Sequence, residues 1–238
     1  MAIGTVDDSQ RKAARVVAIA YLCTNALCIF AQFYARSSLI VADDAAKTAA
    51  NIMASERLFR LSIAGELAAF AGLVVLIAAL YVILKPVNRH LALLAAFWRL
   101  IEISLCVVMT LSSFDALRFV GGAASYLRTF EQDRLQALMM LSLDAHDDAY
   151  GVGIFFFGLG STVFSYLWFQ SNYIPRALAA WGIFSSVLTA ICTFAFFIFP
   201  KLDDLLDPWC YMPVLVFETA LPLWLLFKGL RPPATALA

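Results

Sequence analysis

Arg99 and three carboxylates lie inside long apolar runs of this sequence, where their side chains could do chemistry. Arg99 and Glu102 stand three residues apart in the run 91–119, and Glu66 and Glu218 lie in two other runs. Residues three apart share one face of a helix. A charged side chain at the centre of a bilayer costs roughly 2.5–3.5 kcal/mol on the insertion scale. These groups must therefore face protein, water or each other.

The leading hypothesis for these residues is a buried polar pocket, open to the outer side, that binds or moves a small ligand, with an amphipathic ligand as one candidate. Its polar contacts would be Arg99 and the three carboxylates, together with Arg60 near the mouth of the second apolar run. Ionisable residues inside membrane segments indicate a functional site by default. The alternative is structural, because Arg99 can pair with Glu102 or with Glu66 and hold helices in register.

A second group of candidates is the acidic run 144–148, which contains one histidine. Asp144 and Asp148 share a helix face, and together with His146 they offer ligand types that bind a divalent cation. A metal there would support an enzyme, such as a metal-assisted membrane hydrolase acting on lipid. The spacing matches no zinc-enzyme motif such as HExxH, and a solvated acidic cap at the start of a helix is the simpler interpretation. The sequence indicates no particular cofactor.

The composition places these residues in a multi-pass membrane protein. Of 238 residues, 63% are hydrophobic and 14% are charged, whereas soluble domains have about 45–50% and about 25%. The apolar runs are continuous rather than alternating, which predicts membrane-spanning helices. Basic and acidic residues both number 17, so charge indicates no nucleic-acid partner. The expected partner is the lipid bilayer. A third function, as a structural subunit or assembly factor, would add a membrane partner or a second copy of the chain.

The expected fold is all-α: a bundle of six transmembrane helices with two amphipathic segments on the outer surface. These segments are expected in the polar connections 36–57 and 123–148, and residues 201–208 are expected to form an acidic loop. The short connections carry basic residues on one side, so the positive-inside rule places both termini, 1–15 and 231–238, in the cytoplasm. The predicted spans cover residues 16–34, 58–84, 91–119, 149–170, 177–199 and 211–230.

Five segments, in order along nearly the whole chain, carry a resemblance to a known family. They are AARVVAIAYL, DDAAKTAANIMASERLFRL, LYVILKPVNRHLALLAAFWRLIE, FFFGLGSTVFSYLWFQSNYIPRAL and, after Glu218, LWLLFKGL. Together they resemble the DUF4386 family of bacterial integral membrane proteins. The matching family positions are Asn51, Arg60, Arg99, Glu102, Phe156, Phe157, Gly158, Pro175 and Arg176.

The resemblance also shows one departure. Many members of the family carry a histidine two residues after the Phe-Phe-Gly piece, where this chain has Gly160. This departure puts any chemistry centred on that histidine in doubt. The resemblance implies a bacterial inner-membrane protein and supports the topology. It implies no activity, because the function of the family is undefined.

Overall fold

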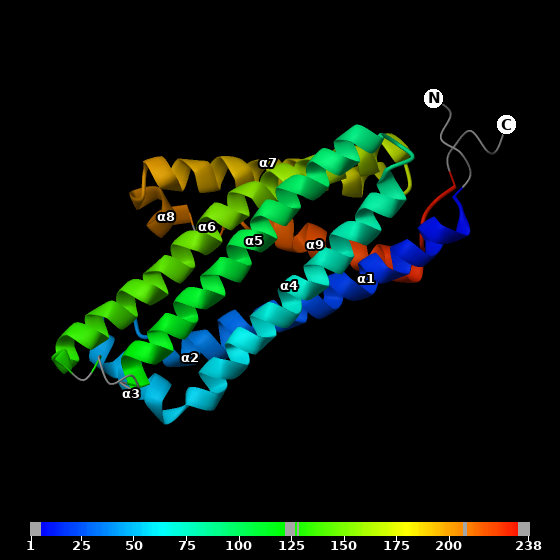
Figure 1. Cartoon of the computed structure of the whole chain (residues 1–238). Helices are drawn as coiled ribbons and strands as arrows, with labels where there is room; N and C mark the ends of the chain where they lie inside the picture. Colours follow the sequence, from blue (N-terminus) through cyan, green and yellow to red (C-terminus); the bar gives the residue numbers. More distant parts are fainter. Residues whose placement is uncertain (1–5, 122–126, 128, 207–208, 233–238) are drawn as a thin grey trace. The chain divides into compact units, whose positions relative to one another are not determined.

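The computed structural model describes residues 6–121, 127, 129–206 and 209–232, and within these ranges every regular element is a helix (Figure 1). This confirms the all-α class. The first five residues of the expected cytoplasmic N-terminal segment, most of the tail 231–238 and part of the second polar connection lie outside the described residues.

Five helical segments of the described chain are long and apolar enough to cross a membrane, and they correspond in order to the first five predicted spans. Their bounds are Asp8–Leu39, Glu56–Leu84 (α4), Arg89–Gly121 (α5), Gln132–Ser171 (α6) and Arg176–Ile198 (α7). The sixth apolar helix, α9 (Met212–Phe227), has 16 residues. At 1.5 Å per residue it is about 24 Å long, which is less than the ~30 Å hydrocarbon core. The sixth span therefore stays a prediction.

The first of these segments is not a uniform α-helix. α1 (Asp8–Ile29) continues as a π-helical stretch, η1 (Phe30–Arg36), and ends in α2 (Ser37–Leu39). A π-helix bonds each residue to the fifth one along, so it changes which side chains share a face, and such stretches are frequent at functional sites. Arg36 is buried in η1. The helical segment continues to Leu39, beyond residue 34 where the predicted first span ends, and Arg36 is buried within it rather than opening a polar connection.

The connection that follows contains α3 (Ala45–Ala54). The Asp44 carboxylate accepts a hydrogen bond from the Lys47 backbone N–H at 2.9 Å, which stabilises the start of the helix. At Ser55 the backbone leaves helical geometry, with φ −132° and ψ 42°, and α4 begins at the next residue. A helix thus lies ahead of the second span, whereas the amphipathic segment expected there and its position on a membrane surface stay predictions.

α6 joins two elements that the sequence analysis had separated. The expected amphipathic segment within 123–148 and the expected span 149–170 form one helix of 40 residues from Gln132 onwards. Its length of about 60 Å is roughly twice the hydrocarbon thickness. The separation was wrong because aspartate and histidine make a helix polar without ending it. For the same reason a short helix, α8 (Lys201–Leu206), occupies most of the expected acidic loop.

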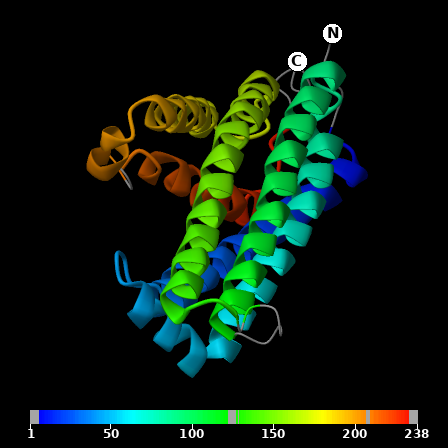
Figure 2. The same cartoon turned by 60° about the vertical axis from the view of Figure 1, so that its left-hand side comes forward.

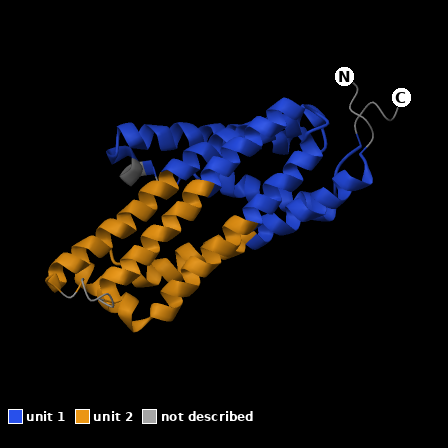
Figure 3. Ribbon diagram, in the orientation of Figure 1, with its two compact units in different colours: residues 1–23, 72–103, 152–238 blue, residues 24–71, 104–151 orange. Residues whose placement is uncertain are grey.

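The chain divides into two compact units (Figure 3). Unit 1 comprises residues 1–23, 72–103 and 152–238, and unit 2 comprises residues 24–71 and 104–151. In unit 1, α7 packs against α8 and α9. The segments of α4, α5 and α6 that belong to unit 2 lie side by side in two views (Figures 1 and 2). The buried apolar core of unit 2 contains Leu39, Ala49, Ile52, Phe59, Ile63, Ala116, Met139 and Leu143.

Candidate functional site

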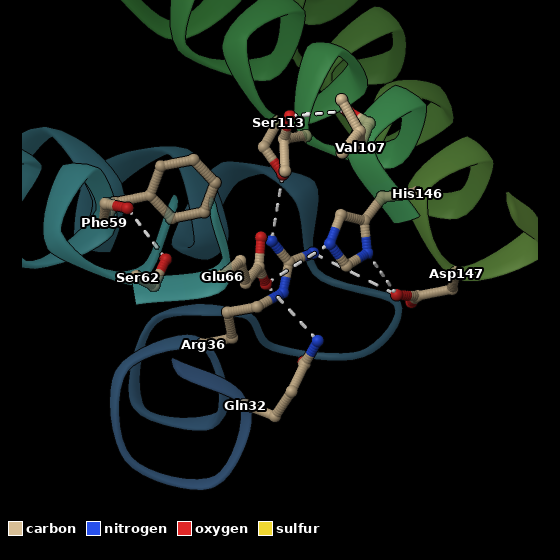
Figure 4. A network of polar contacts seen from close by, with 10 residues as sticks. Gln32, Arg36, Phe59, Ser62, Glu66, Val107, Ser113, His146 and Asp147 are labelled. Carbon is tan, nitrogen blue, oxygen red and sulfur yellow. Dashed lines mark hydrogen bonds and ion pairs between the residues drawn. The ribbon is translucent and has the colours of Figure 1, made fainter. Parts of the chain in front are cut away.

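Unit 2 holds a buried network built around one arginine, one glutamate and one histidine (Figure 4). Arg36 comes from η1, Glu66 from α4 and His146 from α6, and the three side chains point toward one another. Their relative exposures are 3%, 1% and 0%. Ionisable groups removed from water to this extent need partners within the protein, so the contacts within the network define what it can do.

His146 lies between a buried and an exposed carboxylate. Its Nδ1 atom is 2.9 Å from Oδ1 of Asp147, and its Nε2 atom is 3.4 Å from Oε1 of Glu66. The Asp147 side chain is 74% exposed, whereas that of Glu66 is buried. The imidazole therefore connects the interior of unit 2 to its surface.

Arg36 and Gln32, both from η1, complete the network. Arg36 donates a hydrogen bond from Nη1 to the Ser113 hydroxyl at 3.1 Å, and its Nη2 atom is 4.0 Å from Oδ1 of Asp147. The Gln32 side-chain amide donates to Oε1 of Glu66 at 3.3 Å. Four helical elements thus contribute polar groups to one place.

Three atoms of this network are buried and make no hydrogen bond: Arg36 Nη2, Glu66 Oε2 and His146 Nε2. Buried polar atoms in native proteins almost always have a partner, and leaving one unsatisfied costs about 1–3 kcal/mol. The three atoms include a donor, an acceptor and a ring nitrogen that can be either. They are therefore suited to proton exchange or to contacts with a polar ligand.

A second buried charge pair lies in unit 1. Arg99 Nη1 and Glu102 Oε2, both on α5, are 3.0 Å apart, and the two side chains are 3% and 6% exposed. This is one of the two pairings expected for Arg99. The guanidinium also donates to Ser161 Oγ at 3.4 Å and lies over the Phe157 ring, 4.4 Å from its centroid. Arg99 is thus enclosed by an ion pair, a hydroxyl and an aromatic face.

Gly160 of α6 provides the space that the Arg99 side chain occupies. A Cβ atom added at this position would lie 2.7 Å from Arg99 Cγ and 3.0 Å from the Ala95 carbonyl oxygen. Carbon atoms in contact are normally about 3.5–4.0 Å apart, so a larger residue would displace Arg99 or the α5 backbone. The absence of a side chain at position 160 therefore fits this placement of Arg99.

The structure divides the five expected ligand-binding residues between the two units. In unit 1, Arg99 contacts Glu102, and the partly buried Glu218 interacts electrostatically with both. In unit 2, Glu66 belongs to the buried network, and Arg60 is an exposed residue about one and two-thirds turns away along α4. Their role in binding a ligand stays a prediction.

The three expected metal ligands are not gathered into one site. Asp144 and Asp148 are exposed, whereas His146 is buried against Glu66 and Asp147. Within the residues that the structure describes, no group of three or more His, Cys, Asp or Glu side chains is placed to hold a metal ion. The metal site stays a prediction to which this geometry adds no support.

Sequence reasoning missed Arg36, Gln32 and Ser113 as members of the site. Gln32 and Arg36 are four residues apart near the end of an apolar run, and that spacing was an available signal for a shared helix face. Hydropathy alone does not reveal this signal, because the predicted span ends at residue 34 and so includes Gln32 but not Arg36.

An open pocket of about 350 Å³ lies in unit 2 at α3, α4 and α5. Most of its wall is apolar, and three charged side chains stand among the apolar ones. Arg60 pairs with Glu56 at 2.6 Å, and Arg118 pairs with Asp115 at 2.7 Å. The lining residues are Ile52, Met53, Glu56, Arg60, Phe114, Leu117, Arg118, Val120 and Gly121.

Comparison with known proteins gives one match. No curated protein and no solved structure matches the chain. A single family model, described as a domain of unknown function (DUF4386), matches residues 16–229. The match covers four of the five candidate membrane segments in full, residues 16–39 of the first, and both buried charge clusters. The chain therefore belongs to the DUF4386 family.

Proposed function

We propose that this protein is a multi-pass protein of the bacterial inner membrane that binds a small amphipathic anion in the pocket of unit 2. The observation that supports this is the division of the pocket lining into apolar side chains and guanidinium groups. Phe114 and Leu117 offer contact to a hydrocarbon tail, and Arg60 and Arg118 offer charge-assisted hydrogen bonds to an acidic headgroup.

The ligand headgroup would compete with the carboxylates that already pair with these arginines. The Arg60 and Arg118 side chains are 56% and 67% exposed, and ion pairs at such positions are weak, typically about 0–1 kcal/mol. Exchange of a side-chain carboxylate for a ligand carboxylate or phosphate therefore costs little. The enclosed Arg99–Glu102 pair lacks this freedom, and we assign it a structural role.

A binding experiment in lipid nanodiscs tests the pocket directly. The probe is dansyl-undecanoic acid, and its neutral amide serves as the comparison ligand. We expect the Arg60→Gln/Arg118→Gln variant to bind the acid about tenfold more weakly, since charge-assisted hydrogen bonds contribute about 1.5–3 kcal/mol. Binding of the amide should change little, because the apolar wall is intact.

The matched control is Arg134→Gln, which removes an exposed arginine of unit 2 that pairs with Glu131 three residues away. This arginine does not line the pocket. If the double variant and this control weaken the acid equally, only surface charge attracts the probe and the proposed site is wrong.

We further propose that α9 is the sixth span, which places both termini in the cytoplasm. A helix shorter than the hydrocarbon core is accommodated by local thinning of the bilayer. Single cysteines at positions 8, 133 and 231, in a variant without the five native cysteines, can be labelled in intact cells with a membrane-impermeant maleimide. We expect only position 133 to react. Reaction at position 231 as well would support five spans.

A further inference from the structure

We propose that His146 passes protons between the exposed carboxylate of Asp147 and the buried carboxylate of Glu66, so that Glu66 exchanges protons with water. This inference does not rest on the ligand pocket. It concerns the buried network of unit 2, whose unsatisfied atoms have no role in the binding of an anion at Arg60 and Arg118.

The two ring nitrogens of His146 face different carboxylates. The distance from Nδ1 to Asp147 Oδ1, 2.9 Å, is that of an ordinary hydrogen bond. The distance from Nε2 to Glu66 Oε1, 3.4 Å, is a few tenths of an ångström longer than such a bond, and a small rotation of either side chain closes it. An imidazole can accept a proton at one nitrogen while it releases another from the second.

Inward transfer balances without any further reactant. The O–H bond of protonated Asp147 breaks, and the lone pair of His146 Nδ1 forms a new N–H bond. The Nε2–H bond breaks, and a lone pair of Glu66 Oε1 forms a new O–H bond. Each broken bond leaves its electron pair on the atom that lost the proton. The ring is neutral before and after. A rotation of the ring that turns the protonated Nδ1 toward Glu66 and the free Nε2 toward Asp147 readies it for the next transfer, so that a proton taken from Asp147 reaches Glu66.

The charges that face the imidazole favour one exchangeable proton. Arg36 contributes a positive charge from η1, Glu66 a negative charge from α4 and Asp147 a negative charge from α6, while α5 contributes the uncharged Ser113 hydroxyl. With a neutral ring and both carboxylates ionised, the network carries a net charge of −1. One bound proton makes it neutral, and a neutral cluster is favoured where the surroundings have a low dielectric constant.

Asp147 gives the network an end in contact with water. Its side chain is 74% exposed, and the neighbouring Asp144 and Asp148 are exposed as well. Exposed carboxylates are too costly in hydrocarbon, so this part of α6 lies at the aqueous boundary. Glu66 is 1% exposed. A proton that reaches it from water must pass a side chain, and His146 is in contact with both carboxylates.

The chain has two histidines, which allows a direct test by nuclear magnetic resonance with ¹⁵N-labelled histidine in nanodiscs. The exposed His90 is the internal reference, and His90→Gln assigns the signals. We expect the signals of the His146 ring nitrogens to change with pH although the ring is buried. In Asp147→Asn the exchange of the His146 ring proton with water should slow at least about tenfold.

The control for Asp147, the exposed end of the network, is Asp148→Asn. This substitution removes an adjacent exposed carboxylate and should leave the exchange rate of the His146 ring proton unchanged.

Protonation of Glu66, the buried end of the network, is followed by the infrared C=O band of its protonated carboxyl group, identified by its loss in Glu66→Gln. We expect hydrogen–deuterium exchange of this band to slow in His146→Gln and not in His90→Gln.

Two results would overturn the proposal. One is a Glu66 band that exchanges equally fast in His146→Gln and in the unmodified protein. The other is equal exchange at His146 in Asp147→Asn and Asp148→Asn. If His146→Gln does not fold, as shown by circular dichroism and gel filtration, the Asp147→Asn comparison still decides, because that substitution is isosteric and lies at the surface.

Discussion

Each unit of this protein buries an arginine next to a glutamate, and the two arginines differ in which elements provide their partners. In unit 1, Arg99 and Glu102 are neighbours on one helix, 3.0 Å apart. In unit 2, Arg36, Glu66 and His146 come from three elements, and each has a buried polar atom without a hydrogen bond. Burial is similar in the two clusters, and Glu102 Oε2 in unit 1 is also a buried atom without a hydrogen bond; the clusters differ in that one joins neighbours on a single helix and the other joins separate elements. The comparison indicates that contact with an exposed carboxylate, Asp147 in unit 2, more than burial of the charges, separates a reactive network from a structural ion pair.

The largest expected effect is the loss of Arg99. Arg99→Ala leaves the Glu102 carboxylate buried without its partner, and removing one member of a buried pair costs about 3–5 kcal/mol. The free energy of unfolding, measured by denaturant titration in mixed micelles, should fall by this amount. Arg99→Ala/Glu102→Ala should recover part of the loss, because no lone charge remains. If the double variant is as unstable as the sum of the single variants, the pair is not the source of stability.

A smaller effect is expected from the glycine beside Arg99. Gly160→Ala forces Arg99 or α5 to move, and overpacking of this kind costs about 1–3 kcal/mol. Gly65→Ala in unit 2 is the matched control, because a Cβ there meets its nearest neighbour at 3.8 Å. Thermal unfolding of the two variants makes the comparison. A tolerated Gly160→Ala would show that Arg99 is loosely held and would weaken the contrast between the units.

Glu66→Gln should destabilise the protein less than Glu102→Gln does. Glutamine has the shape of glutamate and keeps an oxygen for the Gln32 amide, and Arg36 retains Asp147 at 4.0 Å. We expect a loss of about 1 kcal/mol, the usual net value of one hydrogen bond. The same denaturant titration serves as the measurement. A loss as large as that of Glu102→Gln would mean that Glu66 has a structural role like that of Glu102.

The smallest effect is expected at the surface of unit 2. Arg134 and Glu131 are 3.7 Å apart, and their side chains are 71% and 82% exposed. Exposed pairs contribute about 0.2–1 kcal/mol, so Arg134→Gln should hardly change the unfolding midpoint. This variant sets the baseline for the other three. A large shift would indicate that the detergent or lipid environment, rather than the named contacts, controls the measurement.

The sequence predicted those features that depend on neighbouring residues. Apolar runs identified the five long helices, and the spacing of Arg99 and Glu102 is that of a pair within one helix. Each of these follows from a window of a few turns.

The unit 2 network could not be predicted in this way. His146 and Glu66 come from helices that are distant in the sequence. Arg36 faces them from a π-helical stretch that no residue pattern predicts. His146 was interpreted through its acidic neighbours, although the structure turns it toward the interior while Asp144 and Asp148 face outward. Contacts between distant elements and local changes of helical register are properties of the packed chain.

The π-helical stretch Phe30–Arg36 makes the length of the first segment as important as its composition. A π-helix holds about one more residue per turn than an α-helix, so the seven residues of this stretch turn the chain about as far as six residues of α-helix. A relative that is one residue shorter here can form a regular α-helix and still direct its arginine at the network. A relative of the same length in regular α-helix would direct the same arginine elsewhere, so among homologous sequences the number of residues must be considered together with the arginine.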